Sequence, residues 1–215
     1  MRIGIIGGAG RAGRALFNEA TKRGDVPTAI VRDLSKAEGV LGEFGNYLHK
    51  DALKLTASDL ASFDVVIDAM GTSPGEASRH VDLTKHLVAL TRGKDAPRLV
   101  FVLGAGSLTV AGNRLFLDEL YELPGTASWI AIPEQQYRQL KFLRTVDDVD
   151  WTGISPSAEF VPGPAGKPVL GGDELLRGPK GGSKVTTGTL AVAVLDEIHA
   201  PAHRRQRFTV RDEDC

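Results

Sequence analysis

Residues 1–13 read MRIGIIGGAGRAG, a short apolar segment followed by glycines at every third position. The segment 3–6 is almost purely apolar, which is typical of a buried strand in a parallel sheet. Beyond the glycines, apolar residues recur at helical spacing over 12–20. Strand, glycine turn and helix in this order are typical of the corner that holds the pyrophosphate of a dinucleotide. The sequence therefore predicts an α/β fold with a doubly wound, mostly parallel sheet, helices on both faces and a small C-terminal substrate lobe.

The three glycines have different expected roles. Gly7 lets the chain turn tightly, Gly10 lets the backbone approach the pyrophosphate, and Gly13 lets the helix pack close to its strand. The start of the helix adds free N–H groups and a partial positive charge. Because the chain holds 25 glycines, the triplet is informative only through its place between a strand and a helix. The alternative is a tight strand–helix turn that binds no ligand.

The spacing Gly-x-x-Gly-x-x-Gly resembles that of the short-chain dehydrogenase/reductase superfamily. Within it, the chain is similar to the atypical branch described as NADH-flavin-reductase-like or biliverdin-reductase-like NAD(P)-binding proteins. The resemblance runs nearly end to end, through the segments MRIGIIGGAGRAGR, TAIVRDLSK, DVVIDAMGTSP, WTGISPSAEFVPGP and LAVAVLDEIHAPAHRRQRFTV. It implies a Rossmann-type fold, a nicotinamide cofactor and reductase activity, often on an unassigned substrate.

Composition favours one domain over residues 1–215, with a loop-rich substrate-side lobe over 155–187. The chain carries 26 basic and 27 acidic residues, so its charge suggests neither a nucleic acid nor a membrane as partner. Its one cysteine, Cys215, allows no internal disulfide. The spacing of its histidines matches no known metal motif, and we expect no metal site. We expect a cytoplasmic protein, either a monomer or a homodimer.

The end of the second strand, over 28–31, is the place that selects the cofactor. An acidic residue there binds the ribose 2′-hydroxyl of NAD, whereas an arginine meets the 2′-phosphate of NADP. Here Arg32 comes first and Asp33 follows, with Ser35 and Lys36 close by. We therefore expect NADP(H) to be preferred and NAD(H) to be possible.

Other cofactor contacts are expected where the later strands end. The resemblance places Asp51 and Ala52 beside the adenine, although Asp51 could equally open a loop. A small-residue segment after the strand 65–69 is expected to pass behind the cofactor, and 155–157 to lie near the nicotinamide. The full set of expected cofactor-binding residues is Gly7, Gly8, Ala9, Gly10, Arg11, Ala12, Gly13, Arg32, Ser35, Lys36, Asp51, Ala52, Ala69, Met70, Gly71, Thr72, Gly104 and Pro156.

Three residues are candidates for catalysis. Tyr137 and Lys141 have the Tyr-x-x-x-Lys spacing of the superfamily's catalytic pair, and one helical turn places both on one helix face. An ammonium near the phenol lowers its pKa, so that the phenol can protonate a carbonyl as hydride arrives. Ser107 follows the strand 98–103, where the superfamily keeps a hydroxyl that holds the substrate carbonyl. The flavin-reductase-like relatives generally lack the tyrosine, so a chance match is the alternative.

The remaining segments are expected to shape the substrate side. We expect 108–133 to form a flap, a short helix or a dimer contact, and 161–182 to form the substrate-side lobe. A small strand pair is expected between 174–176 and 183–186. His80 and His86 fall in the helix predicted over 76–91, and we expect surface or helix-side histidines there.

Three functions are compatible with these patterns. The first is an NAD(P)H-dependent reductase that transfers hydride to a flavin, a quinone or a similar flat conjugated acceptor, with flavin as a possible substrate. The second is a carbonyl reductase or epimerase-like enzyme that uses Ser107, Tyr137 and Lys141. The third is a non-catalytic sensor that binds NADP(H).

Overall fold

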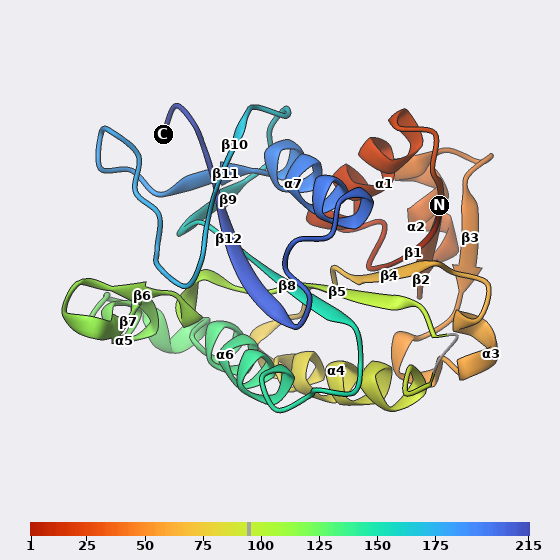
Figure 1. Cartoon of the computed structure of the whole chain (residues 1–215), viewed down its shortest axis with the longest axis horizontal. Coiled ribbons are helices and arrows are strands. Elements are labelled where there is room, and N and C mark those ends of the chain that lie inside the picture. The colour runs from red at the N-terminus through yellow and green to blue at the C-terminus, as the bar shows by residue number, and fades with distance from the viewer. Residues whose placement is uncertain (94–95) are drawn as a thin grey trace.

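The computed structural model describes residues 1–93 and 96–215 and contains one central eight-stranded sheet (Figure 1). The strand order is β10-β12-β8-β5-β4-β1-β2-β3, and every neighbouring pair is parallel except β10 with β12. The strands are β1 (Arg2–Ile6), β2 (Val26–Val31), β3 (Asn46–His49), β4 (Val65–Asp68), β5 (Arg98–Val102), β8 (Trp151–Pro156), β10 (Pro168–Gly171) and β12 (Gln206–Asp212). The mostly parallel, doubly wound sheet is confirmed.

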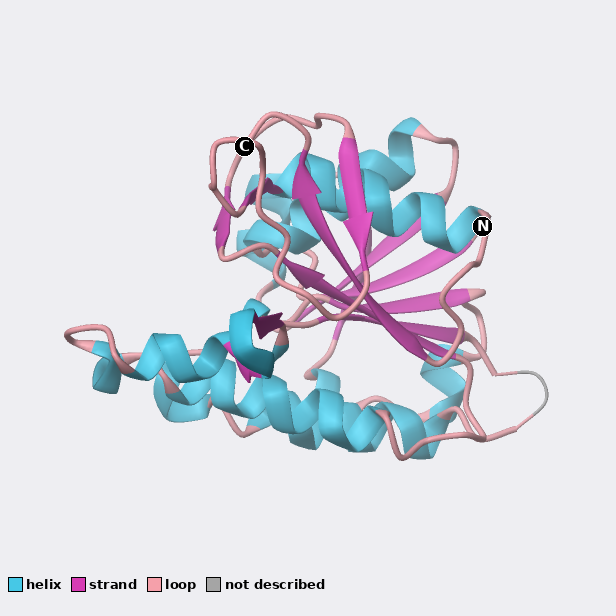
Figure 2. Ribbon diagram, turned by 60° about the vertical axis from the view of Figure 1, so that its left-hand side comes forward, coloured by secondary structure: helices cyan, strands magenta, loops and turns pink. Residues whose placement is uncertain are grey.

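Helices cover both faces of the sheet, as Figures 1 and 2 show. One face packs on α1 (Arg11–Lys22), α2 (Leu34–Leu41) and α7 (Thr187–His199), and the other on α3 (Ala57–Leu60), α4 (Arg79–Leu90) and α6 (Ala131–Leu143). In β4, Val65 and Ile67 face the first layer, while Val66 faces the second. Because both faces are buried, the strand is a continuous apolar run rather than an alternating one.

The segment between β5 and α6 forms an arm beside the sheet (Figure 2). It contains the hairpin of β6 (Thr109–Val110) and β7 (Arg114–Leu115), followed by α5 (Phe116–Tyr121). Short 3-10 turns lie at Ala105–Ser107, Ala111–Asn113 and Thr126–Ser128, and two more precede α3 and α4 at Ala52–Lys54 and Pro74–Glu76. The expected short helix is therefore present, preceded by a small hairpin.

The C-terminal lobe pairs differently from our expectation. β11 (Lys184–Thr186) lies parallel to β9 (Glu159–Val161), so the predicted pairing of 174–176 with 183–186 is wrong. The segment at 174–176 turns to the arm instead, where the Leu175 N–H donates to the carbonyl oxygen of Thr109 at 2.9 Å. The contacts of Glu174 and Leu175 with Thr109 connect the lobe to the arm.

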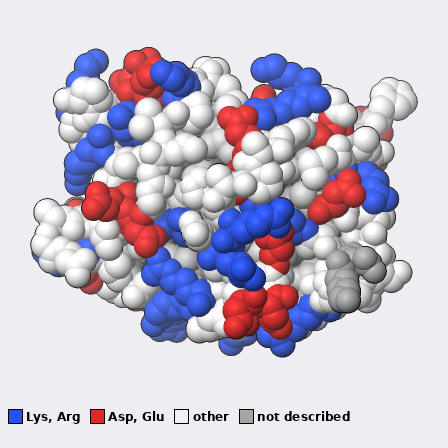
Figure 3. Space-filling view, in the orientation of Figure 1, with Lys and Arg blue, Asp and Glu red and all other residues white. Residues whose placement is uncertain are grey.

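Charged side chains of both signs are interspersed over the face shown in Figure 3. This distribution agrees with the formal net charge of −1. Within residues 1–93 and 96–215, the helices are too short or too polar to cross a membrane.

Candidate functional site

A cavity of about 650 Å³ runs along the edge of the sheet where the parallel strands end. Ligands of open α/β sheets bind at this edge. Fifteen of the expected cofactor-binding residues line the cavity: Gly7, Ala9, Gly10, Arg11, Ala12, Arg32, Lys36, Asp51, Ala52, Ala69, Met70, Gly71, Thr72, Gly104 and Pro156. Gly8, Gly13 and Ser35 are not among the lining residues.

The glycines of the first turn are required by close packing. Gly7 has a φ of +73°, and a Cβ there would lie 2.8 Å from the carbonyl oxygen of Ala69. A Cβ on Gly13 would lie 2.2 Å from the carbonyl oxygen of Gly7, and one on Gly8 would lie 2.6 Å from the Cβ of Ala29. Gly8 and Gly13 therefore act by letting α1 and β2 approach the turn, which explains why neither lines the cavity.

The start of α1 has the form of an anion site. Gly10 is the N-cap and provides no side chain to bind the N–H groups of the first turn. Those groups and the helix dipole favour a phosphate at this end of the cavity. Arg11 also lines the cavity, and its guanidinium donates to the carbonyl oxygen of Phe160 at 3.1 Å. The turn and its helix therefore fit the pyrophosphate of a dinucleotide.

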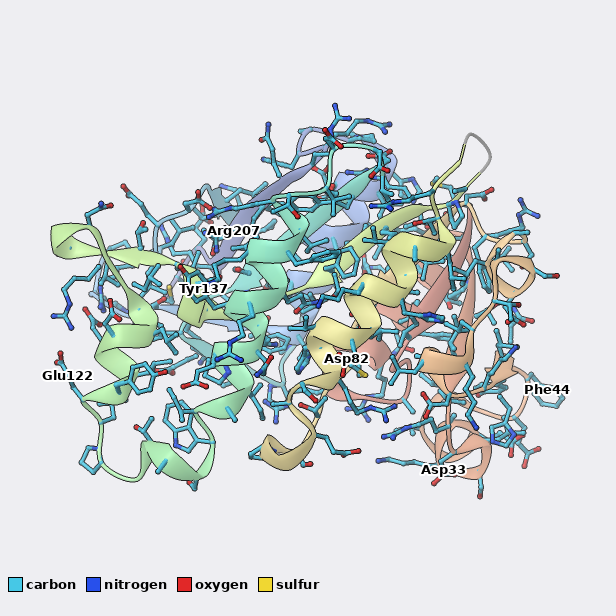
Figure 4. All side chains as sticks on the ribbon, turned by 90° about the horizontal axis from the view of Figure 1, so that it is seen from below. Asp33, Phe44, Asp82, Glu122, Tyr137 and Arg207 are labelled. Atoms are coloured by element: carbon cyan, nitrogen blue, oxygen red, sulfur yellow. The ribbon has the colours of Figure 1, made fainter. Side chains whose placement is uncertain are left out.

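Charged side chains gather beyond this turn, where β2 and β3 end. Arg32, Asp33 and Lys36 follow β2, and Figure 4 marks Asp33 at this side of the molecule. Asp33 caps α2, because its Oδ1 accepts the Lys36 N–H at 2.9 Å. The carboxylate that made the cofactor preference ambiguous therefore has a structural role in α2.

Asp51 and Arg79 form an ion pair in the same region. Arg79 Nη2 lies 2.9 and 3.1 Å from the two carboxylate oxygens of Asp51. Burial favours the neutral carboxyl, but the Leu53 N–H, Arg79 and the nearby Arg32 together hold the pKa of Asp51 below its usual range. Arg79, the first residue of α4, lines the cavity and was missed by the sequence analysis.

The middle of the cavity lies over the end of β4. Asp68 is buried there, its Oδ1 accepts the Met70 N–H at 3.0 Å, and burial raises its pKa to about 7. His80 is 2 % exposed, lines the cavity, and its Nε2 lies 3.2 Å from Thr72 Oγ1. Burial lowers the pKa of His80 to about 4, so the ring is neutral at pH 7. His80 is a buried residue of the cavity wall, and our expectation of a surface or helix-side histidine missed this position.

The far part of the cavity, where β5 and β8 end, has an uncharged wall. Gly104 and Ala105 follow β5, Pro156 and Ser157 end β8, and α6 contributes Ile132 and Gln136. The charged residues among the described lining follow β1, β2 and β3 or begin α4, with Arg11 the first residue of α1 and Lys36 within α2. Most of the charge thus lies on one side of the cavity, and Arg11 is the charged residue that reaches the other side, where its guanidinium contacts Phe160 of β9.

The three candidate catalytic residues lie outside this lining. Ser107 is buried, and its Oγ lies 3.3 Å from Arg207 Nη1. Tyr137 lies on the flank of α6 that faces α5 (Figure 4), with Lys141 Nζ 5.0 Å from its ring centre. The predicted Tyr–Lys proximity is present, but neither side chain is among the residues that line the cavity. The face that lines the cavity presents Ile132 and Gln136 at the same i, i+4 spacing.

Ser107 belongs to a network centred on Arg207, whose side chain is 1 % exposed. Its Nη1 donates to Ser155 Oγ at 3.0 Å, and Nε donates to Asp173 Oδ1 at 2.7 Å. Ser155 Oγ in turn donates to the carbonyl oxygen of Gly104 at 3.0 Å. The network joins the C-terminal lobe to the residue that follows β5. Among the described residues, no group of three or more His, Cys, Asp or Glu side chains is placed to hold a metal ion.

Comparisons with known proteins show the family to which the chain belongs. A family model described as NAD(P)H-binding matches residues 7–201. An uncharacterized protein of Bacillus subtilis (strain 168), YwnB, is 38% identical, and the match covers 99% of each chain. A crystal structure of a Lactobacillus casei protein has a TM-score of 0.92 at 40% identity, with both chains covered completely.

A third relative, from Streptococcus pneumoniae TIGR4, is described as a candidate NADH-flavin reductase. Its crystal structure has a TM-score of 0.88 at 29% identity, and the match covers 99% of each chain. The glycine corner, the strand order and the family match all lead to one assignment. This chain belongs to the NAD(P)H-binding family of atypical short-chain dehydrogenase/reductase proteins.

Proposed function

We propose that this protein is an NADP(H)-dependent reductase that transfers hydride to a flat conjugated acceptor, a flavin or a quinone. The observation that carries the proposal is the division of the cavity into a charged side and a neutral side. The charged side suits the phosphates and adenosine of a dinucleotide, and the neutral side suits the nicotinamide and an uncharged ring. The bound nicotinamide supplies the hydride. The protein binds and aligns the two rings.

The preference for NADP(H) over NAD(H) is supported by Arg32 and its neighbours. Arg32 lines the cavity, while Asp33 caps α2 and Asp51 is paired with Arg79. A 2′-phosphate at this place would meet Arg32 and Lys36, and a phosphate bound by guanidinium forms strong charge-assisted hydrogen bonds. Lys36 and Arg32 are both exposed, which leaves them accessible to a nucleotide.

The character of α6 favours a flat acceptor over a simple carbonyl. A carbonyl becomes an alkoxide as hydride arrives, so its reduction benefits from a general acid within reach. Ile132 has no proton to give, and the amide of Gln136 is not an acid. A flavin or quinone spreads the added charge over its ring and can take its proton from water. The positions of Ser107, Tyr137 and Lys141 do not favour the carbonyl reductase alternative.

Binding of the two cofactors to Arg32→Ala tests the proposal. The variant loses a charge-assisted contact worth about 1.5–3 kcal/mol. Its affinity for NADPH should therefore fall by roughly ten- to a hundredfold, and its affinity for NADH should remain nearly unchanged. Arg138→Ala, which removes an exposed arginine of α6 outside the cavity lining, is the matched control. Calorimetry gives the affinities, and turnover with flavins, quinones and simple carbonyls gives the acceptor class. An equal loss of both cofactors, or turnover of carbonyls alone, would contradict the proposal.

A further inference from the structure

The side chain of Gln136 lies directly across Gly104 in the neutral part of the cavity. A Cβ on Gly104 would come within 2.1 Å of Gln136 Oε1 and within 3.0 Å of its Cδ. Gly104 has a φ of −105°, which any residue can adopt. Glycine is therefore needed here because the amide of Gln136 approaches the backbone closely, rather than for its backbone conformation.

Hydrogen bonds hold the backbone of Gly104, on which the Gln136 amide packs, in place. The carbonyl oxygen of Gly104 accepts a hydrogen bond from Ser155 Oγ, which itself accepts one from the buried Arg207. A side chain packed on such a surface has fewer accessible rotamers than one in solvent. Gln136 is thus partly ordered before any ligand is present.

The polar atoms of Gln136 are free to meet a ligand. Within the part of the chain that the structure describes, no hydrogen bond joins its amide to another protein group, although the residue is half-buried and lines the cavity. Gln139, one turn further along α6, contrasts with it, because its Nε2 donates to Thr84 Oγ1 at 2.8 Å. Gln139 fastens α6 to α4, whereas Gln136 presents an amide to the cavity.

The chemistry of the amide defines what it can recognise. Gln136 offers an acceptor oxygen and a donor N–H₂ side by side, so it can form paired hydrogen bonds with a ring edge that carries N–H beside C=O. Ile132, one turn earlier on α6, is uncharged, and so are Met70 and the neutral His80 in the middle of the cavity. An imide edge meets this requirement, whereas a quinone carries only acceptors.

We propose that Gln136 is a specificity-determining residue that binds the imide edge of the acceptor ring. The inference rests on the proposed function, since it places the acceptor in the neutral part of the cavity. Gln136 does not donate a proton to the reaction. It orients a ring that carries N–H beside C=O and gives such a ring an advantage over one that lacks the N–H.

Binding of two flavins to the NADP⁺-loaded protein tests this inference without requiring turnover. Lumiflavin has the imide N–H, and its N3-methyl derivative carries a methyl group in place of that hydrogen and so has no donor there. Flavin fluorescence should show that the native protein binds lumiflavin about tenfold more tightly, as one or two hydrogen bonds would give. In Gln136→Leu the two flavins should bind equally. Gln135→Leu alters the adjacent, half-buried glutamine outside the lining and should keep the preference.

Three results would overturn the inference: equal binding of the two flavins by the native protein, a preference that survives in Gln136→Leu, or no binding of either flavin. The affinity for NADP⁺, measured for each variant, shows whether the cavity is intact. The rate at which the protein oxidises NADPH with a quinone that has no N–H tests the reductase proposal separately. If the protein turned over the quinone but bound the two flavins equally, the role of Gln136 would be excluded and the reductase proposal would still hold.

Discussion

Gly10 and Gly13 belong to one turn, but added side chains would meet different surroundings. A Cβ on Gly13 would contact the backbone of Gly7 at 2.2 Å, whereas one on Gly10 would lie 3.0 Å from the Gly7 carbonyl oxygen. Gly13→Ala should therefore lower the free energy of unfolding by about 1–3 kcal/mol. Gly10→Ala should change it by less than about 1 kcal/mol but weaken the binding of NADPH at least about tenfold, since its Cβ would enter the space that we assign to the pyrophosphate. Urea unfolding and calorimetry separate the two effects, and unchanged NADPH affinity in Gly10→Ala would contradict the placement of the pyrophosphate.

Asp68 should make the stability of the protein depend on pH. Its pKa is about 7 in the folded chain and about 4 when exposed, so the folded state holds a proton that the unfolded state releases. The protonated carboxyl stabilises the folded state fully below about pH 4, and this stabilisation is lost as the pH rises towards 7. Asp68→Asn stays neutral and can still accept the Met70 N–H.

The stability gained by Asp68→Asn over the native protein should therefore grow between about pH 4 and 7. The slope should reach up to about 1.4 kcal/mol per pH unit and level off above pH 7. Urea unfolding across this range measures it. A constant difference between the two proteins at all these pH values would mean that Asp68 titrates alike in both states.

Individual residues show what the sequence could predict. Gly7, Gly10 and Arg32 follow strands directly, so their places at the sheet edge could be inferred from the order of elements. Arg79, His80 and Gln136 reach the cavity from within helices, and their placement depends on how α4 and α6 are rotated about their axes. A helix with apolar residues on more than one side leaves that rotation undetermined by its periodicity.

At the level of elements, the rotation of α6 decides which residues can take part in the reaction. Tyr137 and Lys141 share a face, but the cavity is lined by Ile132 and Gln136. Tyr137→Phe should therefore change kcat with the best flavin or quinone by less than about twofold, since a general acid would contribute about 10²–10⁴-fold. Steady-state kinetics with NADPH measures this. A hundredfold loss at unchanged NADPH affinity would restore the phenol as an acid.

Asp173 is one of the residues that join the C-terminal lobe to the sheet. Its carboxylate accepts from Arg144 at 2.9 Å and from the buried Arg207, whose charge would otherwise lack a partner. Asp173→Ala should lower the free energy of unfolding by about 1–3 kcal/mol and speed proteolysis within 172–182. Glu174→Ala, which removes an exposed neighbour, should do neither. Equal proteolysis of the two variants would show that the lobe is held by other contacts.

The pairing of this lobe illustrates the limit of reading elements from sequence. The segments 159–161 and 184–186 are separated by a proline- and glycine-rich stretch, and each is only three residues long. Short strands carry little periodic signal, so their pairing depends on tertiary contacts such as that of the Ala158 N–H with Ser183 Oγ at 3.2 Å. The long strands and helices, by contrast, were predicted from their apolar patterns.

Across the whole molecule, the sheet order converts separate loops into one divided cavity. The ends of β1, β2 and β3 provide the charged side, and the ends of β5 and β8 provide the neutral side. We propose that a dinucleotide binds along this edge, with its nicotinamide towards Gly104 and Pro156. On this proposal, NADPH transfers hydride to a flat ring bound in this cavity, and Tyr137 donates no proton.

Anaerobic reduction of lumiflavin by NADPH, with and without deuterium at the transferred position, tests that claim most directly. We predict a protein-dependent rate of flavin reduction that saturates with substrate and falls when NADPH is deuterated. The rate should be faster with NADPH than with NADH, and the Arg32→Ala variant should lose this preference. The same isotope effect should be seen in Tyr137→Phe. The proposal would be contradicted if the rate were no greater than that of NADPH and flavin without the protein. It would also be contradicted if neither deuterium nor the Arg32→Ala substitution changed the rate.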